Sequence, residues 1–110
     1  MWMNCYEHTL IIKQEVPSNQ TKVLINKYQD IINKNSGKVL KTEEWGLRNL
    51  TRIIKNNRKG FYFHIKFEGI GTTIEELEKA ENIDQMLIRF LTVRVKKHDL
   101  ETNYFSKKDL

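Results

Sequence analysis

The chain has 110 residues, which suffices for one domain with a single hydrophobic core but not for two. Its net charge of +5 favours polyanionic partners, although so modest an excess also occurs in proteins that bind no nucleic acid. The single Cys5 excludes an intramolecular disulfide and favours a reducing compartment, and no apolar run approaches the roughly 20 residues that span a bilayer. The histidines are scattered without ligand spacing, so we expect no metal site and no cofactor, and the N-terminus lacks the pattern of a secretory signal.

The first predicted elements are a strand and a helix. Residues 6–12 are rich in strand formers and alternate weakly, which predicts the first strand. Pro17 and Ser18 then open a helix with Ser18 as its expected N-cap, and apolar residues recur at helical spacing over residues 24–32. Gly37 fits the left-handed residue that ends many helices.

A long β-hairpin is predicted next. Its first arm covers about residues 38–55, with Gly46 marking a bulge or bend, and its second arm covers residues 61–67, across an Asn-Asn turn at residues 56–57. In the second arm Phe61, Phe63, Ile65 and Phe67 share one face, while Tyr62, His64 and Lys66 share the other.

The remaining pattern predicts a short helix and a last strand. Residues 73–76 resemble a capping box, which starts a helix that continues through Ala80. The last strand covers about residues 90–97, where we expect one face to meet the core (Leu91, Val93, Val95) and the other to point outward (Thr92, Arg94, Lys96).

The element order is therefore β-α-β-β-α-β, the ferredoxin-like arrangement of the α+β class. This order predicts a four-stranded antiparallel sheet with two helices on one face, and it leaves the other face to solvent or a partner. The domain is expected to cover residues 3–98, followed by a polar tail at residues 99–110.

Positive charge gathers in the predicted hairpin. From Arg48 to Lys66 the chain has six basic residues and no acidic one, a composition suited to binding phosphates. A solvated hairpin that only keeps the protein soluble would have the same composition. The predicted nucleic-acid contacts are Arg48, Arg52, Lys55, Arg58 and Lys59 in the hairpin, and Arg89, Arg94, Lys96 and Lys97 in a second patch.

Other side chains carry weaker signals. Residues 59–63 partly match the aromatic motif of RNA-recognition domains, but alternation favours core packing of Phe61 and Phe63 over base stacking. His8 is expected to be a packed histidine with one hydrogen bond, and His64 faces away from the phenylalanines, where it is a candidate partner contact. Trp45 either anchors a protein partner or covers the sheet edge of its own domain. No nucleophile or carboxylate partner is predictable for either histidine, so we expect no catalysis.

Four stretches in chain order carry a more specific signal: Tyr6-Glu7, Trp45-Gly46-Leu47-Arg48-Asn49-Leu50, the basic turn at residues 55–60, and the strand at residues 88–95. The second of these is similar to a Trp-Gly-x-basic-x-Leu signature. In their order and spacing, over roughly residues 3–98, they resemble the bacterial-type small-subunit ribosomal proteins of the S-six family.

Some positions depart from the family pattern. Arg52 lies two residues after the signature leucine, where the family usually has an aromatic residue, and Asn4 and Cys5 precede the Tyr-Glu pair in place of a basic residue. Met3 is an alternative start, and the long acidic tail of some members is missing. These departures bear on individual RNA contacts rather than on membership of the family.

The resemblance implies a structural ribosomal protein that binds the central domain of small-subunit rRNA together with the S-eighteen protein, on a bacterial or organellar ribosome. It implies no small-molecule substrate. The leading alternative is a ferredoxin-like regulatory module that binds a protein or metabolite without RNA. An acylphosphatase-like hydrolase is a third, but no Gly-rich turn with an adjacent Arg follows the first strand.

Overall fold

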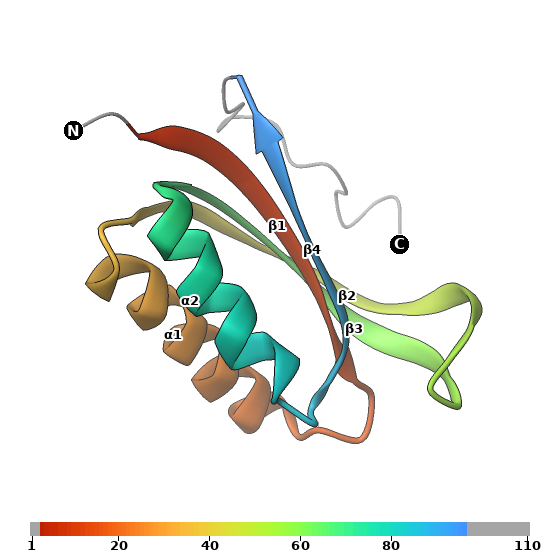
Figure 1. Cartoon of the computed structure of the whole chain (residues 1–110). Helices are drawn as coiled ribbons and strands as arrows, with labels where there is room; N and C mark the ends of the chain where they lie inside the picture. The colour runs from red at the N-terminus through yellow and green to blue at the C-terminus, as the bar shows by residue number, and fades with distance from the viewer. Residues whose placement is uncertain (1–2, 97–110) are drawn as a thin grey trace.

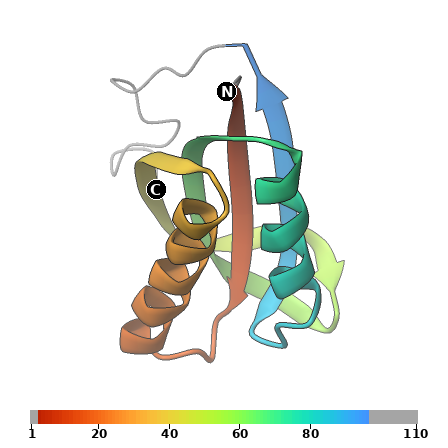
Figure 2. The ribbon, with the colours of Figure 1, turned by 60° about the vertical axis from the view of Figure 1, so that its left-hand side comes forward.

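The computed structural model describes residues 3–96. Its elements follow the order β1 (Asn4–Lys13), α1 (Ser18–Lys34), β2 (Lys38–Ile54), β3 (Asn57–Gly69), α2 (Gly71–Asn82) and β4 (Leu87–Val95). The four strands pair antiparallel in the order β2-β3-β1-β4, and both helices cover one face of the sheet (Figures 1 and 2). This is the predicted ferredoxin-like arrangement. The end of the domain at residues 97–98 and the tail lie outside the described residues, so that boundary stays a prediction.

The core lies between the helices and the sheet. Tyr28 and Ile32, four residues apart on α1, are fully buried, and so is Leu77 of α2. Phe63 and Phe67 are buried beneath them and the partly buried Phe61 packs against the same core, which confirms the predicted core packing. The cluster consists of Leu10, Ile12, Val16, Leu24, Ile25, Tyr28, Ile32, Phe63, Ile65, Phe67, Leu77 and Leu87.

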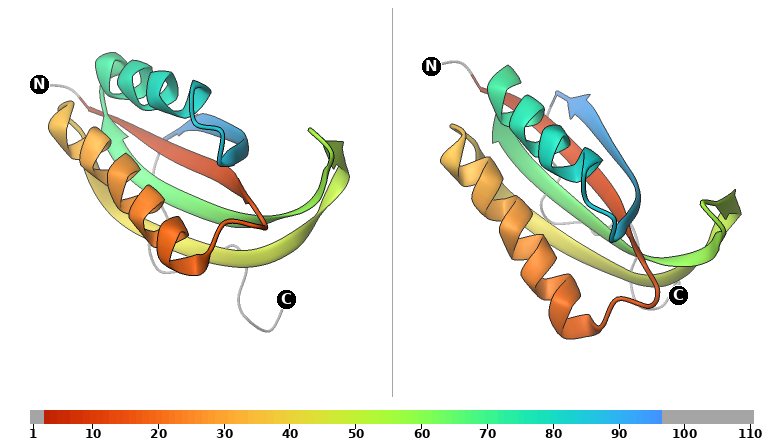
Figure 3. Two further views of the ribbon diagram at one scale, coloured as in Figure 1. Left: turned by 90° about the horizontal axis from the view of Figure 1, so that it is seen from below. Right: turned by 60° about the horizontal axis from the view of Figure 1, so that its bottom comes forward.

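The β2–β3 hairpin extends well beyond the rest of the sheet (Figures 1 and 3). Its turn residues are Lys55 and Asn56, with φ angles of 50° and 65°, rather than the predicted Asn-Asn pair. Two successive left-handed residues form the tight turn that matches the twist of paired strands. Gly46 has a φ of 84° at a register shift in β2, which confirms the predicted bulge.

The predicted orientation of the last strand is wrong. Thr92 pairs with His8 and Phe90 with Leu10, so Phe90 and Thr92 lie on the helix-covered side of the sheet. Leu91 and Val93 are 57% and 48% exposed on the opposite side, which we call the open face. Both faces of β4 carry apolar residues, so alternation alone does not determine which face meets the core.

The predicted helix boundaries also differ in detail. Ser18 is the first residue of α1, with Pro17 at the N-cap, and α2 begins two residues before Thr73. The buried Thr73 hydroxyl accepts a hydrogen bond from the Ile70 N–H at 3.1 Å and donates one to the Asn35 carbonyl at 2.5 Å. Thr73 therefore caps the start of α2 from the third helical position, rather than as the N-cap residue, and it also links α2 to the end of α1.

Gly37 is required for close packing rather than for a left-handed conformation. The positive φ of 64° belongs to Ser36, so the predicted left-handed glycine is wrong by one residue. A Cβ atom on Gly37 would lie 2.7 Å from the Ile32 carbonyl oxygen and 2.8 Å from Thr73 Cγ2. The α1–β2 connection thus passes close to both helices.

Replacing Gly37 with Ala is expected to lower the free energy of unfolding by about 1–3 kcal/mol, because the added methyl meets a backbone oxygen that cannot rotate away. Gly71→Ala is the matched control, since a Cβ there has no atom within 4 Å. Urea unfolding measures both variants. Equal stability of the two variants would contradict the close-packing explanation.

Candidate nucleic-acid interface

The end of the hairpin presents a cluster of exposed basic side chains. Arg52 comes from β2, Lys55 from the turn, and Arg58 and Lys59 from β3, and all are exposed. The tight turn brings the two arms together, so residues up to seven positions apart lie on one projecting tip (Figure 3). The structure therefore places four of the five predicted hairpin contacts together. We call Arg52, Lys55, Arg58 and Lys59 the hairpin cluster.

Arg48 is set apart from the hairpin cluster. It is half-buried, and its Nε–H donates a hydrogen bond to the Trp45 carbonyl at 3.3 Å. The side chain thus bridges the bulge at Gly46. Its part in RNA binding stays a prediction.

The second predicted patch is not one cluster. Arg89 pairs with Ile11 and lies on the open face, whereas Arg94 pairs with Tyr6 on the other side. The two arginines are also near opposite ends of β4, and Lys96 follows the strand. Lys97 lies outside the described residues. These positions therefore offer separate contacts at most.

The open face carries buried charged groups. Glu7, Glu43, Trp45, His64 and Lys66 form what we call the open-face cluster. Lys66 is fully buried, and its Nζ lies 3.4 Å from Glu43 Oε2. The Trp45 indole N–H donates to Glu43 Oε1 at 3.3 Å, and its ring stacks on His64 with centroids 4.8 Å apart. The Trp45 ring therefore covers His64, and its N–H holds one oxygen of the buried Glu43 carboxylate.

His64 is held by two hydrogen bonds. Its Nε2 lies 3.0 Å from Glu7 Oε1, and its Nδ1 lies 2.9 Å from the Thr9 hydroxyl. An ionised carboxylate only accepts, so Nε2–H donates to Glu7. Burial lowers the pKa of His64, and the neighbouring Glu7 offsets this only in part. The neutral imidazole is therefore the form that the fold favours.

This lowered pKa predicts an acid-sensitive fold. The unfolded chain takes up a proton on this imidazole below about pH 6.5 and the folded chain resists it, so stability falls as pH drops through 6.5, by at most ~1.4 kcal/mol per pH unit. His64→Gln, whose amide still donates to Glu7, is expected to lose less stability between about pH 7 and pH 5.5. Urea unfolding followed by tryptophan fluorescence tests this. If the His64→Gln variant lost as much stability over this pH range as the unchanged protein, other titrating groups would be responsible for the acid sensitivity.

Trp45 and His64 are 8% and 4% exposed, so only their outer edges are accessible. Of the two alternatives for Trp45, the structure has the indole covering its own sheet. A partner contact by either residue stays a prediction. Leu91 and Val93 are also exposed on the open face but were not predicted as contacts, because only the strand register shows which side of β4 they occupy.

His8 is a packed histidine, as predicted, but with two partners. Its Nε2 lies 2.6 Å from Glu81 Oε2 and its Nδ1 lies 2.6 Å from the Thr92 hydroxyl, with the His8 and Glu81 side chains fully buried. Burial raises the pKa of Glu81, and the His8 contact offsets this in part. These bonds tie α2 and β4 to the centre of β1.

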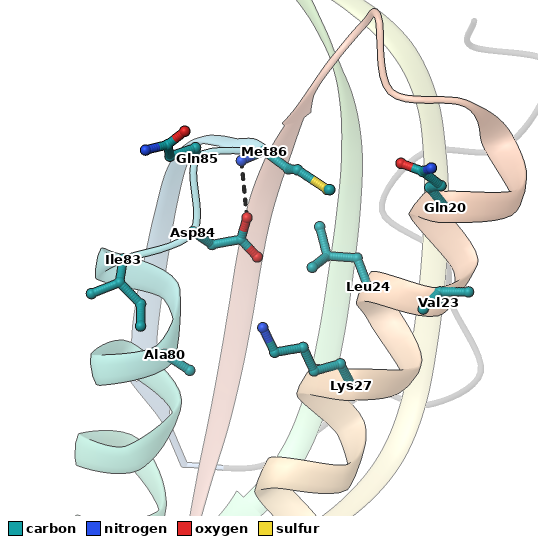
Figure 4. Close-up of a pocket in the computed structure, with 9 residues that line it drawn as sticks. All are labelled: Gln20, Val23, Leu24, Lys27, Ala80, Ile83, Asp84, Gln85 and Met86. Carbon is teal, nitrogen blue, oxygen red and sulfur yellow. Dashed lines mark hydrogen bonds between the residues drawn. The ribbon is translucent and has the colours of Figure 1, made fainter.

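A groove of about 550 Å³ lies between α1 and the end of α2 (Figure 4). Its walls are mainly apolar, with Val23, Leu24 and Met86 among them, and the Met86 N–H donates to Asp84 Oδ1 at 2.9 Å. It has none of the predicted basic contacts. Within residues 3–96 no three or more His, Cys, Asp or Glu gather as a metal site would need, and no helix there is both long and apolar enough to cross a membrane.

Comparison with known proteins identifies the family. Residues 5–94 match the family model described as ribosomal protein S6. The chain belongs to the ribosomal protein S6 family. It is therefore a structural component of the small ribosomal subunit rather than an enzyme, and it is located on the ribosome.

Individual members of the S6 family agree closely with the chain. It is 53% identical to small ribosomal subunit protein bS6 of Pelagibacter ubique over 97% of this chain and 88% of that protein. It is 39% identical to the Brucella anthropi protein of the same name, but spans only 64% of that longer relative. The crystal structure of 30S ribosomal protein S6 from Thermotoga maritima superimposes with a TM-score of 0.81 at 30% identity, covering 86% of this chain and 89% of that one.

Proposed function

We propose that this S6 family member binds the central domain of small-subunit rRNA with its hairpin and pairs with the S-eighteen protein through its open face. The observation that supports RNA binding is the hairpin cluster, which gathers exposed cations on a projecting arm. No acidic residue lies between Arg48 and Lys66 to offset them. Such a tip attracts a polyanion from several directions.

The mechanism is neutralisation of phosphates together with recognition of shape. An A-form helix exposes little of its base sequence to side chains in its deep major groove, so charge and outline dominate recognition. Each bound phosphate releases counterions, which makes the affinity fall steeply with added salt. The paired strands hold the cations on a firm support, which lowers the entropy lost on binding.

The open face supports the proposed protein contact. Leu91 and Val93 are exposed next to β1, where Val93 pairs with Glu7 of the open-face cluster. Exposed apolar residues beside a rigid polar surface are typical of a protein interface. A partner that covers Leu91 and Val93 would also meet the outer edges of Trp45 and His64.

Sedimentation tests the proposal. Tagged protein in a lysate is expected to comigrate with the small subunit on a sucrose gradient and to stay there after a moderate salt wash. Protein confined to the light fractions would contradict RNA binding and favour the regulatory module without RNA. Measuring the affinity for purified rRNA fragments at increasing salt distinguishes RNA binding from the regulatory module, because a mainly apolar protein contact responds little to salt.

A further inference from the structure

A small cavity lies where the hairpin meets the start of β4. It measures about 210 Å³ and is lined by Lys55 of the hairpin turn, Arg89 and Phe90 of β4, and Glu81 and Asn82 of α2. The second hairpin arm packs against the start of β4, where a Cβ on Gly60 would lie 3.1 Å from Ile88 Cδ1. Two cations that are 34 positions apart in sequence thus border one cavity, and residues from both faces can reach it because β4 is an edge strand of the sheet.

The lining combines three kinds of chemistry. Lys55 and Arg89 are exposed cations suited to an anionic group, and Phe90 supplies a partly buried aromatic ring. The Glu81 side chain is fully buried, and its Oε1 has no hydrogen-bond partner among residues 3–96. A buried acceptor without a partner is costly, and a ligand with an N–H donor would satisfy it.

The acidic residues of the lining oppose an anion only weakly. Asp84, which also lines the cavity, accepts hydrogen bonds from the Tyr28 hydroxyl and from the Met86 N–H. Glu81 Oε2 faces His8, and burial raises the pKa of the Glu81 carboxyl, which disfavours its negative charge. The cations at the mouth therefore dominate the attraction of a charged ligand.

The size of the cavity limits the ligand. Drug-sized ligands occupy pockets of roughly 300–1,000 Å³, so a cavity of about 210 Å³ suits one flat ring. A nucleotide combines a flat ring, N–H donors on that ring and a phosphate. Sequence-specific RNA recognition generally uses unstacked bases of this kind, which stack on aromatic side chains.

We propose that this cavity receives one unstacked nucleotide of the bound RNA. Lys55 and Arg89 bind its phosphate, Phe90 contacts its base, and Glu81 accepts a hydrogen bond from a base N–H. The inference rests on the RNA binding proposed above and adds that the RNA is bulged or single-stranded at this point, whereas the rest of the hairpin cluster binds backbone of any sequence.

The test is a titration of ¹⁵N-labelled protein followed by NMR. The probes are a hairpin RNA with one bulged adenosine, the same hairpin fully paired, AMP and ribose 5-phosphate. We expect the bulged RNA to shift the amides of Asn82, Arg89 and Phe90 at concentrations about tenfold lower than the paired RNA, the effect expected from one base–aromatic contact. AMP is expected to shift the same amides, and more strongly than ribose 5-phosphate.

Variants separate the cavity from general charge. Lys55→Gln combined with Arg89→Gln is expected to abolish the preference for the bulged RNA. Arg52 is an exposed hairpin cation outside the cavity lining, so Arg52→Gln should lower the affinity for both RNAs equally. Equal binding of the two RNAs, equal shifts with AMP and ribose 5-phosphate, or tighter binding of AMP than of bulged RNA would each overturn the inference. If RNA binding persists with its salt dependence while the bulge has no effect, only this inference fails; if neither RNA binds, the proposed function fails with it.

Discussion

Replacing Arg58 and Lys59 together with Glu is expected to exclude the protein from small subunits without unfolding it. Both side chains are exposed near the hairpin turn and make no hydrogen bond or ion pair that the described structure includes. Reversal turns attraction for phosphate into repulsion, so the affinity for rRNA should fall by at least ~10-fold at moderate salt, and the salt slope should fall by about two. Sucrose-gradient sedimentation and rRNA binding at several salt concentrations measure these effects.

The control for that variant replaces Lys22 and Lys34 with Glu, which reverses two charges that are exposed on α1. It makes the same change in net charge on the helix-covered side of the sheet. We expect it to enter small subunits nearly as well as the unchanged protein, and circular dichroism checks that both variants fold. Equal losses of incorporation in the two variants would show that net charge, rather than the hairpin, determines binding. Normal incorporation of the hairpin variant would show that the hairpin is not part of the RNA interface.

Replacing Lys66 with Met is expected to have the largest effect on stability. Lys66 is fully buried next to Glu43, whose side chain is only 4% exposed. Removing the Lys66 ammonium leaves the buried Glu43 carboxylate without this ion-pair partner, and breaking a buried pair in this way typically costs about 3–5 kcal/mol. Since a domain of this size is stable by only about 5–15 kcal/mol, the midpoint of urea unfolding should fall markedly.

Two further variants test whether the loss of stability comes from the buried Lys66–Glu43 pair. Lys59→Met, on the same strand but exposed, is expected to change stability by less than about 0.5 kcal/mol. Glu43→Gln combined with Lys66→Met removes both charges and should recover part of the loss, because the remaining amide still accepts from the Trp45 indole N–H. A single Lys66→Met variant as stable as Lys59→Met would show that the buried pair contributes little.

Local patterns in the sequence determined much of the fold. The strand alternation of residues 61–67, the helical spacing of residues 24–32 and the basic run around the turn each depend on near neighbours in the chain. They were enough to predict the element order, the core row of phenylalanines and four members of the exposed hairpin cluster. The residues around Trp45 also carried enough of the family pattern to suggest membership before the comparisons established it.

Strand register was decided only by the tertiary structure. Apolar residues occupy both faces of β4, so a shift by one position exchanges the sides, and only pairing with β1 places Phe90 on the core. The same pairing puts Arg89 and Arg94 on opposite sides, which divides a patch that is continuous in sequence. A pattern of period two contains no information on which of two similar faces is covered.

The sequence by itself therefore determined the class of the fold, the basic hairpin and the resemblance to the ribosomal family, because these depend on neighbouring residues. The tertiary structure alone decided that Lys66 is buried beside Glu43 and His64 against Trp45, and that Lys55 shares a cavity with Glu81 and Arg89. The physical reason is that burial and hydrogen bonding join residues distant in the chain. Their partners are fixed only when the strands pair in one register and the helices pack on one face.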